Sequence, residues 1–358
     1  MALLYHAAAG SGRPRDGLSA SAVVAQEKYH SEFAFVGKQA LWALAGMGAL
    51  LLLSRIDYKF YNSQPFIYTA LSVTTCLLVL VFLMPGSHNT HRWIRFGGLF
   101  TLQPSELAKP VLVLFLAWFL STRLGKMGEW KSTVLRAALI PAVFIVLIVA
   151  QPDLGTALVL AGVTALMFFL AGIKWKYLVG GICLALPPLA ALLIFVPWRL
   201  KRVLVFLHPN CDAKEIPAAS YHVCQSLIAV GAGGVTGRGY MEGVQKLFFL
   251  PEAHTDFIFA NIGEELGLIG SVLIVLLFVV FGYRGLRVAF RVQDPFARLA
   301  AFGITTAILI QAFFNISVVL ALVPTKGIPL PLISSGGTSV CVTLASIGVL
   351  LNISRKAD

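Results

Sequence analysis

The sequence is short of charged residues. Only 12% of its 358 residues are Asp, Glu, Lys or Arg, whereas 58% are hydrophobic. A soluble globular domain is about one quarter charged, so this composition excludes an ordinary soluble enzyme. It also excludes intrinsic disorder, because a chain this apolar would not remain solvated. The class that remains is a protein that crosses a membrane several times.

Cysteine is also scarce. The chain has 5 cysteines, and no two of them have the CxxC spacing. This pattern argues against a structural metal site and against a disulfide scaffold, so we predict no metal site. Cys211 and Cys224 lie in one long loop, where a disulfide is chemically permitted in an oxidising compartment. We nevertheless expect them to be free thiols.

What the sequence does contain is a series of nine apolar stretches. Each is long enough to cross about 30 Å of hydrocarbon as an α-helix. The runs are continuous rather than alternating, which excludes a closed β-barrel. The predicted fold class is therefore all-α, a polytopic helical membrane protein. The predicted spans are 33–53, 65–84, 105–122, 135–150, 154–173, 177–197, 266–283, 299–323 and 330–352.

The distribution of Lys and Arg predicts the orientation. If residues 54–64 are cytoplasmic, the cytoplasmic segments carry 14 basic residues, and the short opposite connections carry only Arg92, Arg95 and Lys326. Long loops are not counted by this rule, which sets aside the six basic residues of 198–265. That loop is predicted to be extracytoplasmic, with short amphipathic or re-entrant pieces on the bundle. The net charge of +12 is thus explained without nucleic acid.

The same orientation places the N-terminus outside the cytoplasm, which is unusual for nine helices without a signal peptide. We interpret residues 1–18 as unstructured and residues 19–358 as a single transmembrane domain. The stretch Ser19-Ala-Ser-Ala-Val-Val-Ala25 resembles the outer end of a helix whose body is missing. Our expectation is a misassigned start or a natural loss of one further helix.

Charged residues in the apolar stretches form one candidate site, because charge inside hydrocarbon is costly. In Gln103-Pro-Ser-Glu-Leu-Ala-Lys109, Glu106 and Lys109 share one helix face. They form either a self-satisfied ion pair near the helix end or a face that meets a further charge, such as Asp153. Asp153 could also cap the fifth helix. We predict a structural charge network of Glu106, Lys109 and Asp153.

Two further segments face the outside in this orientation. His91-Arg-Trp-Ile-Arg95 is either an interfacial anchor or a contact for lipid phosphate, which guanidinium groups bind in bidentate fashion. Pro324–Ser339 contains three prolines and Gly336-Gly337, so it cannot form an undisturbed helix. Irregular backbone at membrane depth lines a cavity or is buried in protein. We predict that this segment walls an outward-facing cavity containing Lys326.

The segment Leu250–Gly267 is the richest in polar side chains, with Glu252, His254 and Asp256 among them. Asp256 is followed by Phe257-Ile-Phe259, which predicts that its carboxylate lies at the boundary between water and lipid. A partly desolvated carboxylate is a better general base. The alternative is a solvated acidic cluster favoured by a helix N-terminus. His254 alone is better explained as a hydrogen-bonding residue than as a metal ligand.

Taken together, these motifs resemble the SEDS family (shape, elongation, division and sporulation proteins) of bacterial cell-wall synthesis. The resemblance runs from about Ser19 to Ile353, and its motifs resemble the division member more than the elongation member. The family has ten helices, and its Ser-Tyr-Gly-Gly motif reads Ser334-Ser-Gly-Gly337 here. The motifs that carry it are Ser19–Ala22, Arg92–Arg95, Gln103–Lys109, Gln151–Thr156, Pro251–Gly267, Pro324–Gly327 and Ile333–Gly337.

The resemblance implies a peptidoglycan glycosyltransferase that polymerises lipid II at the outer face of the cytoplasmic membrane, at the division septum. The family's essential carboxylate falls on Asp256, the implied general base, and undecaprenyl diphosphate leaves. The implied partners are the nascent glycan chain, a class B penicillin-binding protein and other divisome proteins, with no nucleic acid. No cofactor is implied with certainty, and a divalent cation (Mg or Mn) stays open. The candidate substrate-binding residues are Arg92, Arg95, Lys109, Lys326, His254, Glu252 and Ser334.

Two functions of other classes stay open. A lipid II flippase would use charges at mid-membrane, such as Glu106, Lys109 and Asp153, that are accessible from both sides. A non-catalytic divisome scaffold would not need Asp256. A polymerase needs its carboxylate at the outer face, and the densest polar motif adjoins the outer loop. This position favours the polymerase.

Overall fold

The structure is a computed structural model. The residues that it describes are 34–84, 92–96, 100–209, 211, 220–240, 242–244, 250, 255–325 and 327–356. Three predicted site residues, Glu252, His254 and Lys326, lie outside this described part, as do residues 1–33 with the Ser19-Ala-Ser-Ala motif.

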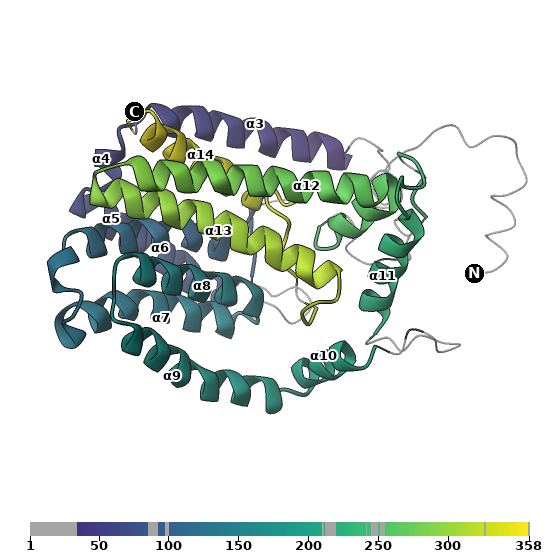
Figure 1. The fold of residues 1–358 in the computed structure, drawn as a ribbon, viewed down its shortest axis with the longest axis horizontal. Coiled ribbons are helices and arrows are strands. Elements are labelled where there is room, and N and C mark those ends of the chain that lie inside the picture. Colours follow the sequence, from purple (N-terminus) through teal and green to yellow (C-terminus); the bar gives the residue numbers. More distant parts are fainter. Residues whose placement is uncertain are drawn as a thin grey trace, which may run out of the picture.

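Apolar helices lie side by side in one bundle (Figure 1). In the described part, seven helices are long and apolar enough to cross a membrane, and two shorter apolar helices span Gln39–Arg55 and Leu154–Leu170. The predicted all-α, polytopic class is confirmed, and seven of the nine predicted spans are long enough to cross, while the other two correspond to the shorter helices. The helices are α3 Ala34–Arg55, α5 Gln64–Leu80, α6 Pro104–Ser121, α7 Leu135–Ala150, α8 Leu154–Leu170, α9 Trp175–Ile194, α12 Ile258–Arg291, α13 Pro295–Val319 and α14 Gly337–Ser354.

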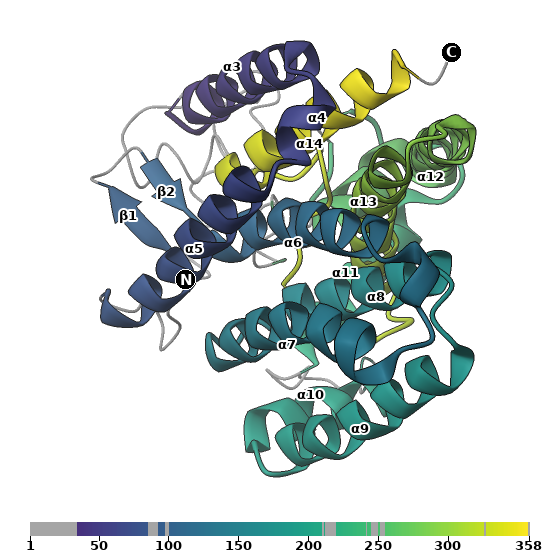
Figure 2. The ribbon, with the colours of Figure 1, turned by 90° about the vertical axis from the view of Figure 1, so that its left-hand side faces the viewer.

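Helices α6 and α13 form the centre of the bundle, and most of their side chains are buried. The two helices pack against each other and against α8, and α3 lies beside α14 (Figure 2). In contrast, α9 has no buried residue and exposes large apolar side chains such as Leu184 and Ile194. An apolar face without protein neighbours suits contact with lipid, since lipid chains are as apolar as the side chains.

One end of the bundle holds the short connections and the C-terminus (Figure 1). The short helix α4 (Tyr58–Tyr61) begins after Asp57, whose carboxylate accepts a hydrogen bond from the Lys59 N–H. Asp294 caps α13 in the same way through the Ala297 N–H. The connection between α6 and α7 contains a 3₁₀ turn, Leu124–Lys126, and a π turn, Trp130–Val134. This is the end that the positive-inside rule predicts to be cytoplasmic.

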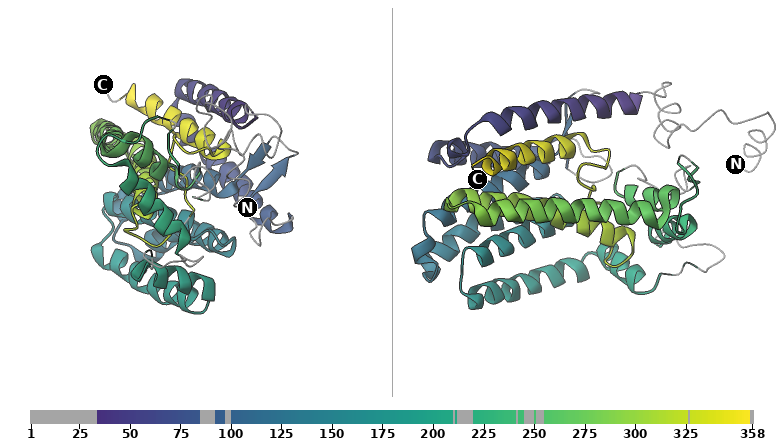
Figure 3. Two further views of the ribbon diagram at one scale, coloured as in Figure 1. Left: turned by 90° about the vertical axis from the view of Figure 1, so that its right-hand side faces the viewer. Right: turned by 45° about the horizontal axis from the view of Figure 1, so that its top comes forward.

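The opposite end carries the longer connections. The strands β1 (Ile94–Phe96) and β2 (Phe100–Leu102) form an antiparallel hairpin that the sequence did not predict (Figure 2). The loop 198–265 contributes the short helices α10 (Pro197–Leu207) and α11 (Tyr221–Gly233). Helix α11 packs against the first turns of α12, as the right-hand view of Figure 3 shows. The prediction of short helical pieces packed on the end of the bundle is thus confirmed.

The start at residue 266 that the sequence predicts for the seventh span coincides with a kink, and a first helical piece precedes it. Helix α12 begins at Ile258 and kinks at Gly267, whose φ is +64°. The kink leaves backbone groups unpaired, and the glycine-rich loop before it satisfies them: Leu268 N–H donates to Gly234 O at 3.0 Å. Glu264 is buried in this turn and accepts from Arg238 Nη1 at 3.2 Å. A buried partner therefore allows the carboxylate of Glu264 to lie inside α12, before the span that the sequence predicts.

The last span begins at Gly337, whereas the sequence predicts a start at residue 330. The residues before it stay irregular because Pro329 and Pro331 have no N–H to donate. Ser334 stabilises this stretch instead, since its Oγ accepts from Leu330 N–H at 2.7 Å and donates to Thr255 O at 2.5 Å. The predicted irregular segment is therefore confirmed.

The expectation of free thiols in the outer loop is wrong. Cys211 and Cys224 form a disulfide with a Cα–Cα distance of 5.4 Å. Cys224 lies in the first turn of α11, and Cys211 follows the end of α10 at Leu207. Within the described part, Cys76, Cys183 and Cys341 are free. The disulfide ties the α10–α11 connection to the bundle.

Candidate functional site

Asp153 lies in a buried polar cluster where α8 begins. It is the N-cap of α8: its Oδ1 accepts from Thr156 N–H at 3.2 Å and its Oδ2 from Thr156 Oγ1 at 2.9 Å. Oδ2 also accepts from Gln103 Nε2 and Ser105 Oγ, both at 3.3 Å. The cap that the sequence left open is thus observed. Asp153 joins the first turn of α6 through Gln103 and Ser105 rather than through Lys109.

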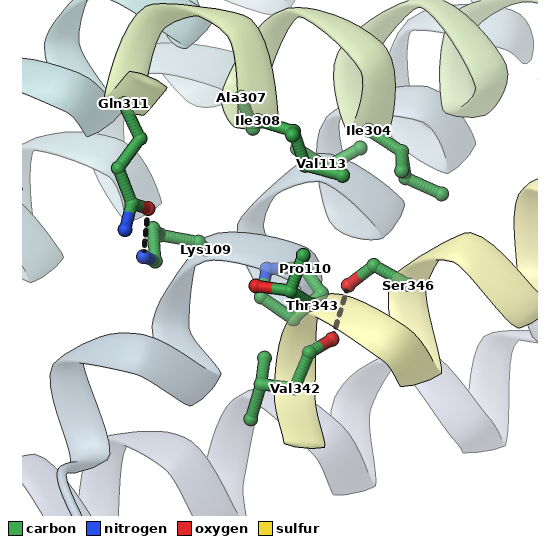
Figure 4. Close-up of a pocket in the computed structure, with 10 residues that line it drawn as sticks. All are labelled: Lys109, Pro110, Val113, Ile304, Ala307, Ile308, Gln311, Val342, Thr343 and Ser346. Carbon is green, nitrogen blue, oxygen red and sulfur yellow. Dashed lines mark hydrogen bonds between the residues drawn. The ribbon is translucent and has the colours of Figure 1, made fainter. Parts of the chain in front are cut away.

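Glu106 and Lys109 form an ion pair in the centre of the bundle. Lys109 Nζ lies 2.8 Å from Glu106 Oε2, and it also donates to Gln311 Oε1 on α13. Lys109 lines a pocket of about 30 Å³ between α6, α13 and α14 (Figure 4). About 10–15 Å³ of such space holds one water molecule, so the pocket has room for about two. A sugar or a lipid headgroup does not fit beside Lys109 in this conformation.

Helix α13 connects this central pair to the outer end. Gln311 donates through Nε2 to Pro329 O at 2.9 Å. One turn further along α13, Asn315 Nδ2 donates to Ile328 O at 2.6 Å and to Asp256 O at 2.8 Å. Two amides of one helix therefore hold the backbone of both segments that the sequence singled out.

Asp256 lies at the outer end of the bundle, two residues before the start of α12. Its side chain is partly exposed, whereas Phe257 and Phe259 after it are buried. The carboxylate packs against Gly327: a Cβ added to Gly327 would lie 2.5 Å from Asp256 Oδ2. Asp256 therefore lies where the chain passes from partly exposed to buried residues, and glycine at position 327 leaves room for its carboxylate.

The two arginines of the motif Arg92–Arg95 have different surroundings. Arg92 donates through Nε to Gln151 O at 3.2 Å and through Nη2 to Pro152 O, which fixes it at the α7–α8 turn. Arg95 is exposed on β1, opposite Thr101. The structure thus separates the two arginines of one sequence motif.

The sequence analysis missed Arg199 and Arg202 on α10. The pKa of Arg202 is lowered by partial desolvation and then by the positive charge of Arg92, while the negative charge of Asp256 raises it. Burial lowers the pKa of Arg199, and Arg92 lowers it further. The signal was present in Trp198-Arg-Leu-Lys-Arg202, which places two arginines three residues apart on a helix. The positive-inside rule does not count long loops, so the charges of Arg199 and Arg202 were not considered.

This arrangement suits proton transfer beside an anionic group. Asp256 supplies one carboxylate at the outer face, and Arg92, Arg199 and Arg202 supply positive charge. A divalent cation takes several oxygen ligands, preferably carboxylates. In the described part, no group of three or more His, Cys, Asp and Glu side chains could hold a metal ion. The guanidinium groups of Arg92, Arg199 and Arg202 suit an anion beside Asp256.

Comparisons with known proteins extend over nearly the whole chain. The FtsW/RodA/SpoVE family model, described as a cell cycle protein, matches residues 17–358. A probable peptidoglycan glycosyltransferase FtsW of Geobacter metallireducens is 43% identical over 343 residues, covering 94% of this chain and 89% of that protein. Stage V sporulation protein E of Bacillus subtilis is 39% identical, covering 94% of this chain and 91% of that protein.

Solved structures are similar as well. A chain from a peptidoglycan synthase complex that coordinates polymerization and crosslinking superposes with a TM-score of 0.76 and 28% identity, covering 90% of each chain. The rod shape determining protein RodA of Thermus thermophilus has a TM-score of 0.65 at 24% identity, covering 99% of this chain and 96% of that one. The second likeness concerns the fold alone.

Proposed function

Because the chain belongs to the FtsW/RodA/SpoVE family of cell cycle proteins, we propose that it is a peptidoglycan glycosyltransferase. Relatives at about 43% identity bear that name. Its substrate is lipid II, which it joins into glycan strands at the outer face of the cytoplasmic membrane during division. The observation that supports this most directly is the position of Asp256, a partly exposed carboxylate two residues before α12, which begins at the end of the bundle opposite the C-terminus (Figure 1).

Asp256 is the general base of the proposed reaction. It takes the proton from the 4-hydroxyl of the acceptor sugar as that oxygen attacks C1 of the growing chain. A new C1–O bond forms on one face of the sugar, and the bond from C1 to the diphosphate oxygen breaks on the other. The configuration at C1 inverts. The diphosphate is a weak base, so it leaves without a general acid and one carboxylate suffices.

The surrounding structure holds this base in place. Asn315 and Ser334 bind the backbone of residues 255 and 256, so the carboxylate is attached to the two segments that α13 fixes. A positioned base is worth more than a mobile one, because catalysis falls steeply with misplacement of about 1 Å. The sequence candidate Ser334 thus acts on Thr255, as a positioning residue rather than as a contact of the substrate.

We also propose that the protein works with a class B penicillin-binding transpeptidase at the septum. The likeness to a chain of a peptidoglycan synthase complex, which couples polymerization to crosslinking, supports such a partner. Coupling the two activities would let each new strand be crosslinked as it leaves the polymerase.

The proposed function is tested by lipid II polymerisation with purified protein and its cognate transpeptidase. We compare wild type, Asp256→Asn, and Asp57→Asn as a matched control, since Asp57 is an exposed carboxylate at the opposite end of the bundle. Glycan strands from wild type and control, with a loss of about 10²-fold or more in Asp256→Asn, support the base. Strands from all three would remove Asp256 from its role.

A third outcome concerns the reaction itself. If folded wild-type protein with its partner makes no strands, the polymerase is wrong. Transfer of lipid II across vesicles that contain the protein would then support the flippase. Absence of transfer would support a scaffold. The small pocket beside Lys109 gives no room for a headgroup in this conformation, which favours the polymerase.

A further inference from the structure

Arg199 is an unusual buried side chain. Only 6% of its surface is exposed, yet among the described residues neither Nε nor Nη1 has a hydrogen-bond partner. A guanidinium has five N–H donors, and leaving them unsatisfied in a buried position is costly. The structure compensates only in part, by placing the guanidinium 4.9 Å from the centre of the Trp198 ring. A buried charge of this kind calls for an anion.

A second guanidinium shares the same ring. Arg202 lies 5.2 Å from the centre of Trp198, so one indole holds two positive side chains of α10. The positive charge of Arg92 also acts on both arginines. Positive charges that lie close together disfavour each other's charged form. In the described part, the negative charge acting on this cluster is that of Asp256, and one carboxylate does not balance three guanidiniums.

The cluster lies beside the proposed base. Arg202 Nη1 donates to Thr325 O at 3.5 Å, and Thr325 is two residues from Gly327, against which Asp256 packs. Helix α10 is held in this place from its far side, because Cys211, just beyond its end, is bonded to Cys224 of α11. The arginines therefore border the position where a bond to C1 would break.

We propose that Arg199 and Arg202 of α10, together with Arg92, bind a diphosphate group beside Asp256. On the proposed function, on which this identification of the ligand rests, the group is the diphosphate of the lipid-linked substrate and leaving group. Two phosphates offer two sets of oxygens, and guanidinium groups bind each set in bidentate fashion. Arg202 is exposed and makes the first contact, whereas Arg199 stabilises the charge that develops on the inner phosphate.

The test is binding without turnover. The full chain is placed in phosphatidylcholine nanodiscs, and undecaprenyl diphosphate is titrated while complex formation is followed by native mass spectrometry. The variants are Arg199→Gln and Arg202→Gln, with Lys201→Gln as the matched control, because Lys201 is an exposed cation of the same helix. We expect each arginine variant to raise the Kd about tenfold or more, and the control to leave it unchanged.

Thermal unfolding separates a binding role from a structural one. Without ligand, Arg199→Gln should melt at the wild-type temperature or above it, because it removes an unpartnered charge. With undecaprenyl diphosphate, wild type and Lys201→Gln should gain stability and Arg199→Gln should not. A Kd for Arg199→Gln equal to that of wild type overturns the proposal. A structural role for Arg199 also overturns it. That role would appear as a lower melting temperature of Arg199→Gln without ligand, which Arg199→Lys restores without restoring binding.

Two further arms identify the ligand. Competition by inorganic pyrophosphate supports recognition of the diphosphate alone, and lack of competition together with undecaprenyl diphosphate binding supports recognition of the lipid-linked form. Equal affinity for phosphatidylglycerol, a monophosphate lipid, overturns a diphosphate site. None of these binding experiments needs strand synthesis, so the diphosphate site and the role of Asp256 are tested independently. Loss of polymerisation with intact diphosphate binding would implicate only the base.

Discussion

The central ion pair and the arginines of α10 are buried in different surroundings. Glu106 and Lys109 are buried in the first two turns of α6, and Lys109 has two partners, Glu106 and Gln311 of α13. Arg199 is just as buried, but it lies at the outer rim, and its Nε and Nη1 have no partner in the described part. Both places hold charge away from water. Within the described part, only the first has protein partners for all the polar atoms named here.

The difference separates charge that maintains structure from charge that awaits a ligand. A paired charge in a low dielectric is held in place by its partner, so it fixes the helices that carry it. Gln311 extends this pair to Pro329, so the central network also holds the outer segment. An unpaired buried charge has the opposite character, since it lowers stability until an anion arrives. We therefore expect substitutions at the two places to act on different quantities.

The largest effect on stability is expected from Lys109→Met. The substitution leaves Glu106 buried without its cation, which should destabilise the protein by about 3–5 kcal/mol. Unfolding in detergent micelles, followed by circular dichroism, measures this change. The double variant Glu106→Gln/Lys109→Met is the control and should recover most of the loss. If Lys109→Met melts like wild type, the central pair is not what holds α6 and α13 together.

The next effect in size concerns the outer end. Removing the disulfide with Cys211→Ser/Cys224→Ser should cost about 3 kcal/mol if the loop it closes is unrestrained when unfolded, since a loop of about 15 residues corresponds to that value. The loss should come with weaker diphosphate binding, because α10 loses its attachment to α11. The substitution Cys183→Ser, at an exposed free thiol, is the control. Unchanged binding in the double variant would show that α10 is held by its own packing.

The sequence predicts the helical part of this fold well, for a physical reason. Apolar runs such as 105–122 and 299–323 must be helical in a membrane, because every backbone group has to be paired within the segment. Helix boundaries are harder to predict where polar residues are buried with partners. Glu264 made the start of α12 look like loop, and only the loop at 234–239 explains why a helix with a kink forms there.

The candidate site was predicted only in part. Asp256 could be singled out because a carboxylate stood directly before apolar residues. Arg199 and Arg202 could not, since their environment depends on where α10 lies relative to the segments that carry Arg92 and Thr325, far away in the sequence. The disulfide is also hard to predict from the sequence. Spacing permits it, but the fold decides whether Cys211 meets Cys224.

A smaller effect, confined to activity, is expected from Gly327→Ala. The added Cβ would lie 2.5 Å from Asp256 Oδ2, so the carboxylate has to shift. A shift of about 1 Å in a catalytic group reduces the rate about 10²-fold. Lipid II polymerisation measures the loss, and melting should change little. The control is Gly48→Ala, whose added Cβ meets nothing within 4 Å. Full activity of Gly327→Ala would mean that the carboxylate works from another position.

The smallest effect belongs to a third kind of charge, the exposed pair of Asp57 and Lys356. The pKa of Asp57 is lowered, first by the hydrogen bond from Lys356 and then by the Lys59 N–H. Since the folded-state pKa lies below the ordinary value of 3.8, the pair stabilises the protein above that pH and the contribution disappears as pH falls through the lowered pKa. Asp57→Asn should therefore cost less than about 1 kcal/mol at neutral pH, and nothing in acid.

Melting curves of wild type and Asp57→Asn at neutral and acidic pH measure this difference, and high salt should abolish it because an exposed pair is screened. A loss as large as that of Lys109→Met would contradict the distinction drawn between the places, since exposure rather than pairing alone would no longer set the effect. A small, salt-sensitive loss would complete it. A pair in water then matters little, a pair in the core matters most, and an unpaired guanidinium at the rim matters only when its anion is bound.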